Sequence, residues 1–355
     1  MAITQPFKNN PRAFMGFVGF VKINKGAVNP NAVGADLIDH EAYTIRATSA
    51  DINLTQEISK PEVVDSRYDR SVYQLGPKLV DGSVSFPVVY EIPAEQERTL
   101  FEILYRYAVT RDDFGELSPF SMDVRYDPSG NADFTYVGCV VNTWKFSVAQ
   151  SDVVTCDFDV VGVDREPATI GPPGRSDTIC TPRGDTTSTF GATRIVTWND
   201  ARVELSGGRI LSPIGGQYIR TFECNITNDV ERFYSMNTVL APQHIAPRKR
   251  DVTGTMTLIG RHPDLSSVAR TNESHCTESS NILFGYKTTD GGEGCSTSTF
   301  NVTLPNTVFE IETMSLTNDI FESTINWHSL PAAGTGSCDP LLTIGAADFT
   351  YEPTS

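Results

Sequence analysis

The sequence is short of basic residues. It contains 28 Lys and Arg against 44 Asp and Glu, so its formal net charge is −16 at pH 7. Proteins that hold nucleic acid carry a basic surface, whereas an acidic surface repels the phosphate backbone. The composition therefore argues against specific binding of DNA or RNA.

Long apolar runs and cysteine motifs are also missing. No stretch approaches the roughly 18–20 apolar residues of a membrane-spanning helix, so we expect no membrane partner. The seven cysteines are scattered without a CxxC pair, which is too dispersed for a disulfide framework. We expect Cys139 and Cys156 to be small buried residues. Cys276 and Cys295 bracket a polar loop, and a disulfide between them stays an open alternative.

The usual motifs of enzymes are absent as well. The five histidines are scattered, and His275-Cys276, the one adjacent pair of metal-ligand type, has no second pair at ligand spacing. There is no phosphate-binding loop, no dinucleotide-binding glycine motif and no nucleophile elbow. Asp157 and Asp159 are two residues apart and fit the solvent face of a strand. The sequence therefore predicts no catalytic residue, no metal site and no cofactor, and a protein that is not an enzyme.

What the sequence does have is alternation with a period of two residues. In Phe134–Val163, Val154, Cys156 and Phe158 alternate with polar residues after the break Gln150-Ser151-Asp152. Two alternating runs across a short polar turn predict an antiparallel hairpin with one buried face. A lone hairpin is marginal in water, so this one must pack on further structure.

Other segments extend the same pattern. Ala94–Val109 predicts the one strong helix, because acids follow Pro93 and an apolar stripe repeats at helical spacing. Two long charged segments, Lys60–Asp81 and Glu231–Arg250, are expected to be functional loops or disordered. Further strands are predicted at 18–23, 43–59, 82–92, 121–126, 202–205, 219–229, 251–259 and 341–344, and a second hairpin is predicted at 307–324.

The order of strand, long loop, strand, helical region and hairpin occurs twice. Ile219–Asp229 aligns with Ile45–Thr55, and Asp251–Ile259 aligns with Asp81–Val89. The helical position of the second copy, Asp264–Ile282, is weak. We therefore expect a mainly β protein with two tandem β-sandwich or barrel domains, each with a flanking helix that is weaker in the second. Their predicted bounds are 1–168 and 193–355, with a Pro/Gly/Ser-rich linker at 169–192.

The hairpin YVGCVVNTWKFSVAQSDVVTCDFDVVG, residues 136–162, resembles the closing hairpin of bacteriophage tail tube proteins. The resemblance is strongest over Tyr43–Val163 and weaker over Ile195–Leu330. It implies tandem fused tube domains of a long-tailed phage. It also implies a structural virion protein that assembles into stacked trimeric, pseudo-hexameric rings. These rings would form the hollow tube through which viral DNA is ejected.

The same resemblance implies partners and contact sites. The partners are copies of the chain itself, a tape-measure protein, tail terminator and tip proteins, and viral DNA that passes without specific binding. The protein would be assembled in the host cytoplasm and reside in the phage tail. In this family, long loops such as the two charged segments reach a neighbouring subunit or the next ring. The candidate contact residues are Arg67, Tyr68, Arg70, Tyr73, Arg232, Arg248, Lys249 and Arg250.

One alternative also fits the composition. A different β-rich virion or surface-binding protein, such as an adhesin, would also lack enzymatic motifs. Polymerisation of the purified chain would favour the tube, whereas binding of a receptor or glycan by a monomer would favour the adhesin.

Overall fold

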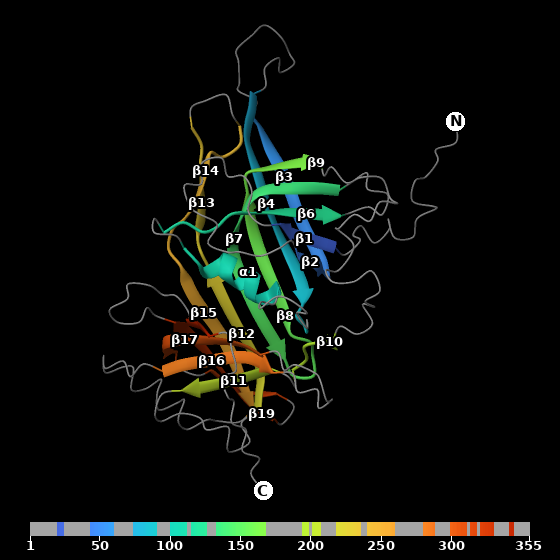
Figure 1. The fold of residues 1–355 in the computed structure, drawn as a ribbon. Helices are drawn as coiled ribbons and strands as arrows, with labels where there is room; N and C mark the ends of the chain where they lie inside the picture. The colour runs from blue at the N-terminus through green and yellow to red at the C-terminus, as the bar shows by residue number, and fades with distance from the viewer. Residues whose placement is uncertain are drawn as a thin grey trace.

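The computed structural model describes residues 20–24, 43–59, 74–90, 100–111, 115–125, 133–167, 194–198, 201–206, 218–235, 240–259, 280–287, 299–310, 313–317, 320–329 and 341–343. These residues are almost all in β-strands, with one helix among them (Figure 1). The expectation of a mainly β protein is therefore confirmed.

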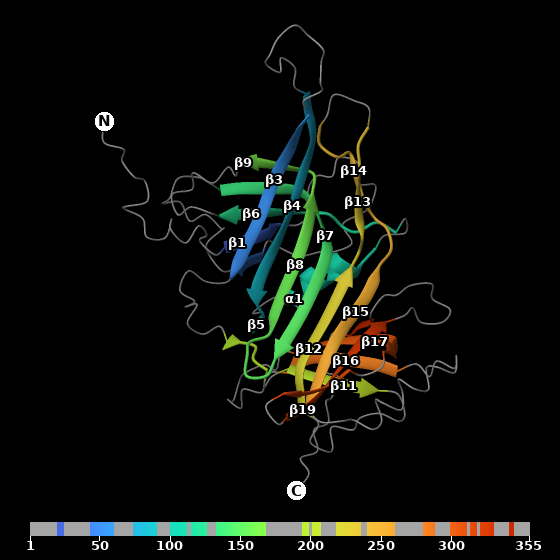
Figure 2. The same cartoon turned by 180° about the vertical axis from the view of Figure 1, so that it is seen from behind.

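The centre of the molecule is a row of eight antiparallel strands, which we call the central row. Each strand is hydrogen-bonded to the next, and the longest strands lie side by side in Figure 2. In order across the row they are β3 (Ser49–Ser59), β4 (Gln74–Pro87), β8 (Thr155–Gly162), β7 (Asp133–Ala149), β12 (Tyr218–Thr227), β15 (Asp251–Ile259), β19 (Ile320–Ser329) and β18 (Thr313–Thr317).

The central row consists of two sets of four strands with the same order of pairing. The first set is β3-β4-β8-β7 and the second is β12-β15-β19-β18. Strand β7 of the first set pairs with β12 of the second, with Thr143–Ala149 opposite Thr221–Thr227. We call this contact the internal joint.

Two smaller sheets branch from strands inside the row, one from β7 and one from β19. At Gly138, whose φ is +61°, β7 passes from its pairing with β8 toward its pairings with β6 and β9. In the second set of strands, β17 pairs with β19 through Thr307–Phe309. The first branch is β6 (Phe120–Arg125), β1 (Phe20–Asn24), β2 (Tyr43–Arg46) and β9 (Asp164–Pro167), and the second is β17 (Thr299–Phe309), β16 (Ser280–Lys287), β11 (Ala201–Ser206) and β20 (Leu341–Thr343).

Three further elements complete the described fold. Helix α1 (Leu100–Val109) lies against one face of the central row (Figure 1). Two short antiparallel pairs lie outside the main sheet. They are β5 (Val89–Tyr90) with β10 (Arg194–Ile195), and β13 (Val230–Phe233) with β14 (His244–Pro247).

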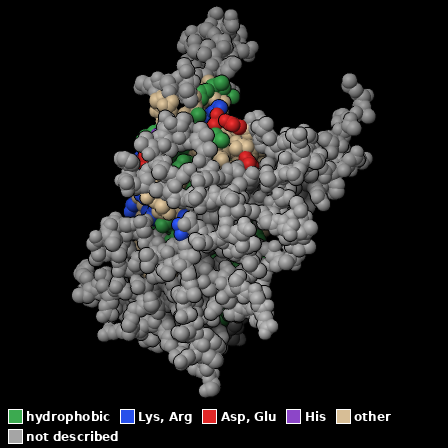
Figure 3. Space-filling model, viewed as in Figure 1, with side chains coloured by type: hydrophobic (Ala, Val, Ile, Leu, Met, Phe, Trp, Pro, Cys, Tyr) green, Lys and Arg blue, Asp and Glu red, His purple; other side chains and the backbone are tan. Residues whose placement is uncertain are grey.

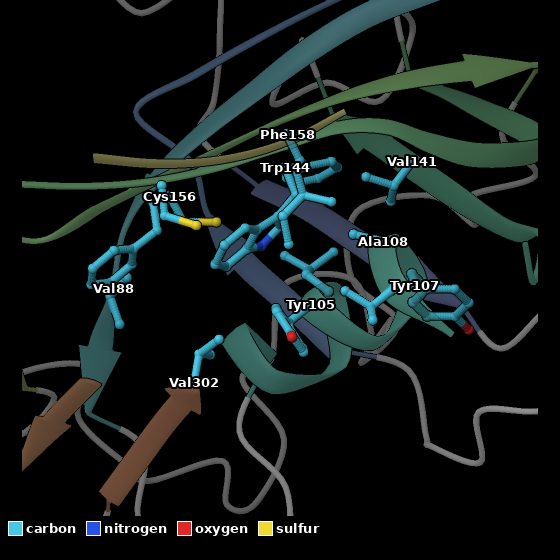
Figure 4. Close-up of a cluster of buried hydrophobic side chains, with 14 of the residues drawn as sticks. Val88, Tyr105, Tyr107, Ala108, Val141, Trp144, Cys156, Phe158 and Val302 are labelled. Carbon is cyan, nitrogen blue, oxygen red and sulfur yellow. The ribbon is translucent and has the colours of Figure 1, made fainter. Parts of the chain in front are cut away.

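The core lies between the central row and α1. Trp144 of β7 is fully buried, and its ring meets the ring of Tyr105 edge-on with 5.3 Å between centroids. Figure 4 shows Cys156 and Phe158 of β8 beside this tryptophan, and Val302 of β17 approaching from the second half of the chain. One apolar cluster therefore holds both sets of strands. Burying aromatic side chains of this size is the main contribution to its stability.

Most predicted elements are present. The predicted hairpin in Phe134–Val163 is β7 and β8, and its buried positions are those that the alternation indicates. The predicted helix at 94–109 is described from Leu100 to Val109 as α1. The predicted linker at 169–192 and most of the second helical position, at 260–279, lie outside the described residues.

The two charged segments were predicted wrongly in part. Strand β4 already begins at Gln74, so the last part of Lys60–Asp81 is strand and not loop. Glu231–Arg250 contains most of the β13–β14 hairpin. These strands form by pairing with distant partners and not through local sequence preference. Neither stretch therefore shows the clear alternation from which a strand could be predicted.

Candidate functional site

The described residues show no constellation for chemistry. Among them, no group of three or more His, Cys, Asp or Glu could hold a metal ion. Cys139, Cys156 and Cys224 are buried and free, which confirms that the first two are small core residues. Burial raises the pKa of the Cys139 thiol to about 12, and the pKa values of the other two are raised for the same reason, so none is a ready nucleophile. His275, Cys276 and Cys295 lie outside the described part.

The described part of the chain holds no helix of the length and apolar character that would cross a bilayer. The features that remain are the faces and edges of the central row.

One face of the central row is polar, and we call it the polar face. It is the side seen in Figure 2, whereas α1 covers the opposite side. Successive residues of a strand point to opposite faces, and paired residues of neighbouring strands share a face. Ser147 and Thr155, which face each other on β7 and β8, are hydrogen-bonded at 2.7 Å. Other members of the polar face are Asp51, Asn53, Ser83, Thr143, Lys145, Asp157, Asp159, Thr221, Glu223, Asn225, Thr253, Thr255, Thr257, Glu322, Thr324 and Asn326.

The polar face is also acidic. Lys145 pairs with Glu223 at 2.9 Å across the internal joint, and Arg220 pairs with Glu322. Partial burial and the neighbouring Asp157 raise the pKa of Asp159, while a hydrogen bond from Thr143 opposes the shift. Asp51, Asp157 and Asp159 add negative charge that the two ion pairs do not balance. The face would therefore repel a phosphate backbone.

The central row has two edges without a described partner. In the part of the chain that the structure describes, β3 pairs only with β4, and β18 pairs only with β19. An open edge leaves backbone groups available to another strand and readily takes one up. On β3, the Ile52 carbonyl also accepts a hydrogen bond from the Tyr136 hydroxyl at 2.7 Å. Strand β18 also exposes 70% of Leu316 and 42% of Met314.

Two hairpins project together from one end of the row, and we call them the arms. The first is the outer part of β3–β4, and the second is β13–β14. Arg232 donates a hydrogen bond to the Val80 carbonyl at 2.8 Å and pairs with Asp81. The hydroxyl of Tyr234 donates to the Lys78 carbonyl at 3.1 Å. The two arms are therefore held side by side.

The arms carry exposed apolar side chains. Ile58 and Leu75, which are partners in the β3–β4 register, are 55% and 45% exposed. Phe233 and Tyr234 of the second arm are 46% and 40% exposed. Figure 3 shows hydrophobic side chains beside charged ones of both signs at this end of the molecule. Apolar groups that gather at one end of a protein indicate a contact surface.

The predicted contact residues have different environments. Arg67, Tyr68, Arg70 and Tyr73 lie outside the described residues. Arg248 and Lys249 are exposed and pair with Glu231 and Asp251 of the same chain. Arg232 joins the two arms, as described above. Whether these residues also touch another subunit stays a prediction.

Arg250 is different because it is only 8% exposed. Its guanidinium donates to the Asn228 side chain at 3.2 Å and to the carbonyl of Val109 at the end of α1. Asn228 in turn donates to the carbonyls of Ala108 and Val141 at 2.9 and 3.1 Å. This buried network joins α1, β7 and β15 and leaves Arg250 little surface for another subunit. The sequence analysis named this residue as a candidate contact, and nothing in the local sequence indicates its burial.

The strand pairing offers a match between the two halves that differs by two residues from the predicted alignment. Gly82 lies opposite Ile52, and Gly254 lies opposite Cys224. Ile52 and Cys224 thus each lie opposite a glycine, whereas the predicted alignment placed Ile52 with Ile226. A shift of two residues keeps every side chain on its own face, so the alternation alone could not reveal it.

These features define a β-sheet protein whose surfaces suit structure and association. Comparison with known families then identifies the group, because residues 28–317 match the family described as phage tail tube protein. The match spans well over half of the chain, so the chain belongs to the phage tail tube protein family. It is accordingly a structural protein of the phage tail, and the family implies self-assembly into a tube. No curated protein matches the chain.

Proposed function

We propose that each chain supplies two tandem tube units of four strands each, and that three chains close into a ring of six similar units. The observation that carries this proposal is the internal joint. Strand β7 ends the first set and pairs with β12, which begins the second. The strands in the corresponding positions at the outer ends of the row are β18 and β3, the two without a described partner. A joint of the same kind between chains would remove both open edges.

The size of the resulting barrel suits a conduit for DNA. Three copies of the eight-strand central row would close a barrel of 24 strands. With strands about 4.8 Å apart and tilted by about 40°, the backbones on opposite sides would be about 45–50 Å apart. That width accepts a DNA duplex together with the side chains that line the channel.

The polar face is the side that would line the channel. Helix α1 packs on the opposite face, and a closed barrel offers such a covering element more room outside than inside. The acidic side chains would then repel the DNA backbone and prevent the ion pairing that drives non-specific binding. DNA could pass during ejection without being held.

The arms would join one ring to the next. They lie together at one end of the molecule and expose Ile58, Leu75, Phe233 and Tyr234. Burying these apolar groups against the next ring would favour stacking along the tube axis. During assembly in the host cytoplasm, the lumen would hold a tape-measure protein, and terminator and tip proteins would close the two ends.

Electron microscopy of the purified chain, with its mass in solution alongside, tests this function. Rings or hollow tubes built from the chain would support the proposal. If the chain stays a monomer at every concentration and also fails to extend isolated tail tips, the proposal is wrong.

A further inference from the structure

We infer that the contact between neighbouring chains has a defined register, in which β18 of one chain pairs antiparallel with β3 of the next and Ser315 lies opposite Asp51. The inference rests on the proposed ring. It goes further because it assigns the partner of each residue along both open edges.

The first step is to match β3 with β12. Gly82 of β4 lies opposite Ile52, and Gly254 of β15 lies opposite Cys224. Both glycines sit where a Cβ atom would be within 2.5 Å of backbone atoms of the neighbouring strand. This shared close approach marks the two positions as equivalent. Ile52 therefore occupies on β3 the place that Cys224 occupies on β12.

The second step is to match β18 with β7. The residue four positions after each glycine is paired with a residue on the third strand of its set. This third-strand residue is in turn paired with a residue on the fourth strand. These partners are Phe86, Cys156 and Phe146 in the first set, and Leu258, Ser323 and Met314 in the second. Met314 therefore occupies on β18 the place of Phe146 on β7.

The register of the internal joint can now be transferred. In that joint, Phe146 lies opposite Cys224 and Ser147 lies opposite Glu223. The same geometry between two chains gives a complete set of neighbours. It pairs Leu316 with Ala50, Ser315 with Asp51, Met314 with Ile52, and Thr313 with Asn53.

The transferred register agrees with the faces of the sheet. It brings the exposed Met314 and Leu316 opposite the core-facing Ile52 and Ala50, and it brings Ser315 opposite Asp51 on the polar face. A slip of one residue would instead place the two apolar side chains beside carboxylate and amide groups. The partner that fits this edge is therefore a second copy of the chain in this register.

The hydrogen-bond pattern of the internal joint selects the best pair for a test. Gln150 N donates to Arg220 O, and Asn228 N donates to Asn142 O, each at 2.8 Å. Hydrogen-bonded and non-hydrogen-bonded pairs alternate, so Ser147 and Glu223 form a non-hydrogen-bonded pair, in which side chains lie closest. Ser315 and Asp51 would form the same kind of pair between chains, at a separation that suits a disulfide.

The experiment is oxidation of assembled chains that carry Ser315→Cys and Asp51→Cys together. We expect dimers and trimers on a denaturing, non-reducing gel. Ser315→Cys with Asn53→Cys, which tests a slip of two residues, should cross-link at least about tenfold more slowly. Ser147→Cys with Glu223→Cys is the control for geometry, because it should close a disulfide within one chain.

The outcomes separate the register from the ring. In one outcome, microscopy shows rings while Ser315→Cys cross-links fastest with Asn53→Cys or with Ser49→Cys. In that case the register is wrong and the proposed function stands. If there are neither rings nor cross-links between chains, both are wrong.

A second pair of variants needs no cysteine. Leu316→Asp should leave the melting temperature of the unassembled chain unchanged, since this side chain is 70% exposed, and should abolish ring formation. Ser315→Ala, the neighbouring change on the polar face, should leave rings intact. If Leu316→Asp still forms rings of normal stability, the apolar side of the joint is misassigned.

Discussion

At the scale of single residues, Gly254 carries a strict steric demand. A Cβ atom at this position would lie 2.1 Å from the carbonyl oxygen of Glu223 and 2.2 Å from the Trp327 ring. Neither the backbone nor a buried indole can move away freely. This close packing allows β12, β15 and β19 to lie flat beside one another.

We therefore expect Gly254→Ala to lower the free energy of unfolding by more than about 2 kcal/mol, as overpacking in a tight core does. Chemical denaturation of the unassembled chain measures this. Thr253→Ala is the matched control on the polar side of the same strand and should cost at most about 1 kcal/mol. Equal losses in the two variants would show that the position tolerates a side chain.

Because the thiols are buried, we expect the free energy of unfolding to fall at alkaline pH. The pKa of Cys139 is raised from its ordinary value of 9.0 to about 12, so above pH 9 this thiol ionises in the unfolded chain before it ionises in the folded one. The unfolded state then binds fewer protons, and stability falls as pH rises, by up to about 1.4 kcal/mol per pH unit for the thiol. Cys224, whose pKa is also raised, adds to this effect.

The measurement is urea denaturation at several pH values between 8 and 11. The Cys139→Ala variant should show a shallower decline with pH than the native chain, whatever its absolute stability. Lysine and tyrosine titrate in both proteins, so the difference between the two slopes reports the thiol. Identical slopes would contradict the assigned shift.

At the scale of elements, the arms can be separated from the fold. Ser59 and Gln74 are paired neighbours at the outer end of β3 and β4. A short turn can therefore replace residues 60–73 without changing the strands. Because β4 includes Lys78 and Leu79, a deletion that extends through Leu79 would remove part of a strand and would not be a fair test.

We expect the shortened chain to keep its melting temperature and to form few long tubes, since the segment that would reach the next ring is gone. Circular dichroism and electron microscopy measure the two effects. A chain with 60–73 replaced by a flexible segment of equal length is the control for length alone. Long tubes from the shortened chain would show that this segment has no part in stacking.

The elements also show how far sequence reasoning reaches. The β7–β8 hairpin was predictable because alternating burial is written directly in its residues, and α1 was predictable from its apolar stripe. The strand Gln74–Lys78 was not, because it contains Gly76 and Pro77 and forms only by pairing with β3. Local sequence says nothing about such distant partners.

The candidate surfaces were less predictable still. Arg250 belongs to a basic run in the sequence, yet its position under α1 buries it. Met314 and Leu316 look like ordinary strand residues, and only the open edge of β18 explains their exposure. Which side of each strand faces α1 follows from the sheet as a whole. The alternation therefore indicated the solvent face for Asp157 and Asp159 but not for most other members of the polar face.

At the scale of the whole molecule, the acidic polar face predicts how tubes treat DNA. Asp157→Lys with Asp159→Lys would reverse charges on this face, where neighbouring side chains are mostly hydroxyls and acids. Tubes with these changes should retain double-stranded DNA that native tubes release, and the retention should fall as salt rises. Co-sedimentation of DNA with tubes measures it.

The matched control reverses a charge elsewhere. Glu166 is exposed on β9, outside the central row, so Glu166→Lys should leave DNA binding unchanged. If the β9 variant retains as much DNA as the polar-face variant, the polar face does not line the channel.

The central claim is that one chain provides two of the six units of a ring. The most direct measurement is the number of chains in a single ring, from its symmetry in electron micrographs and its mass in solution. We expect three chains of 38.9 kDa each, arranged with three-fold symmetry and a pseudo-six-fold inner barrel. A ring of six chains would be compatible with a tube but would contradict the claim. Each chain would then supply one unit, and the contact between β7 and β12 would not mark a boundary between two units.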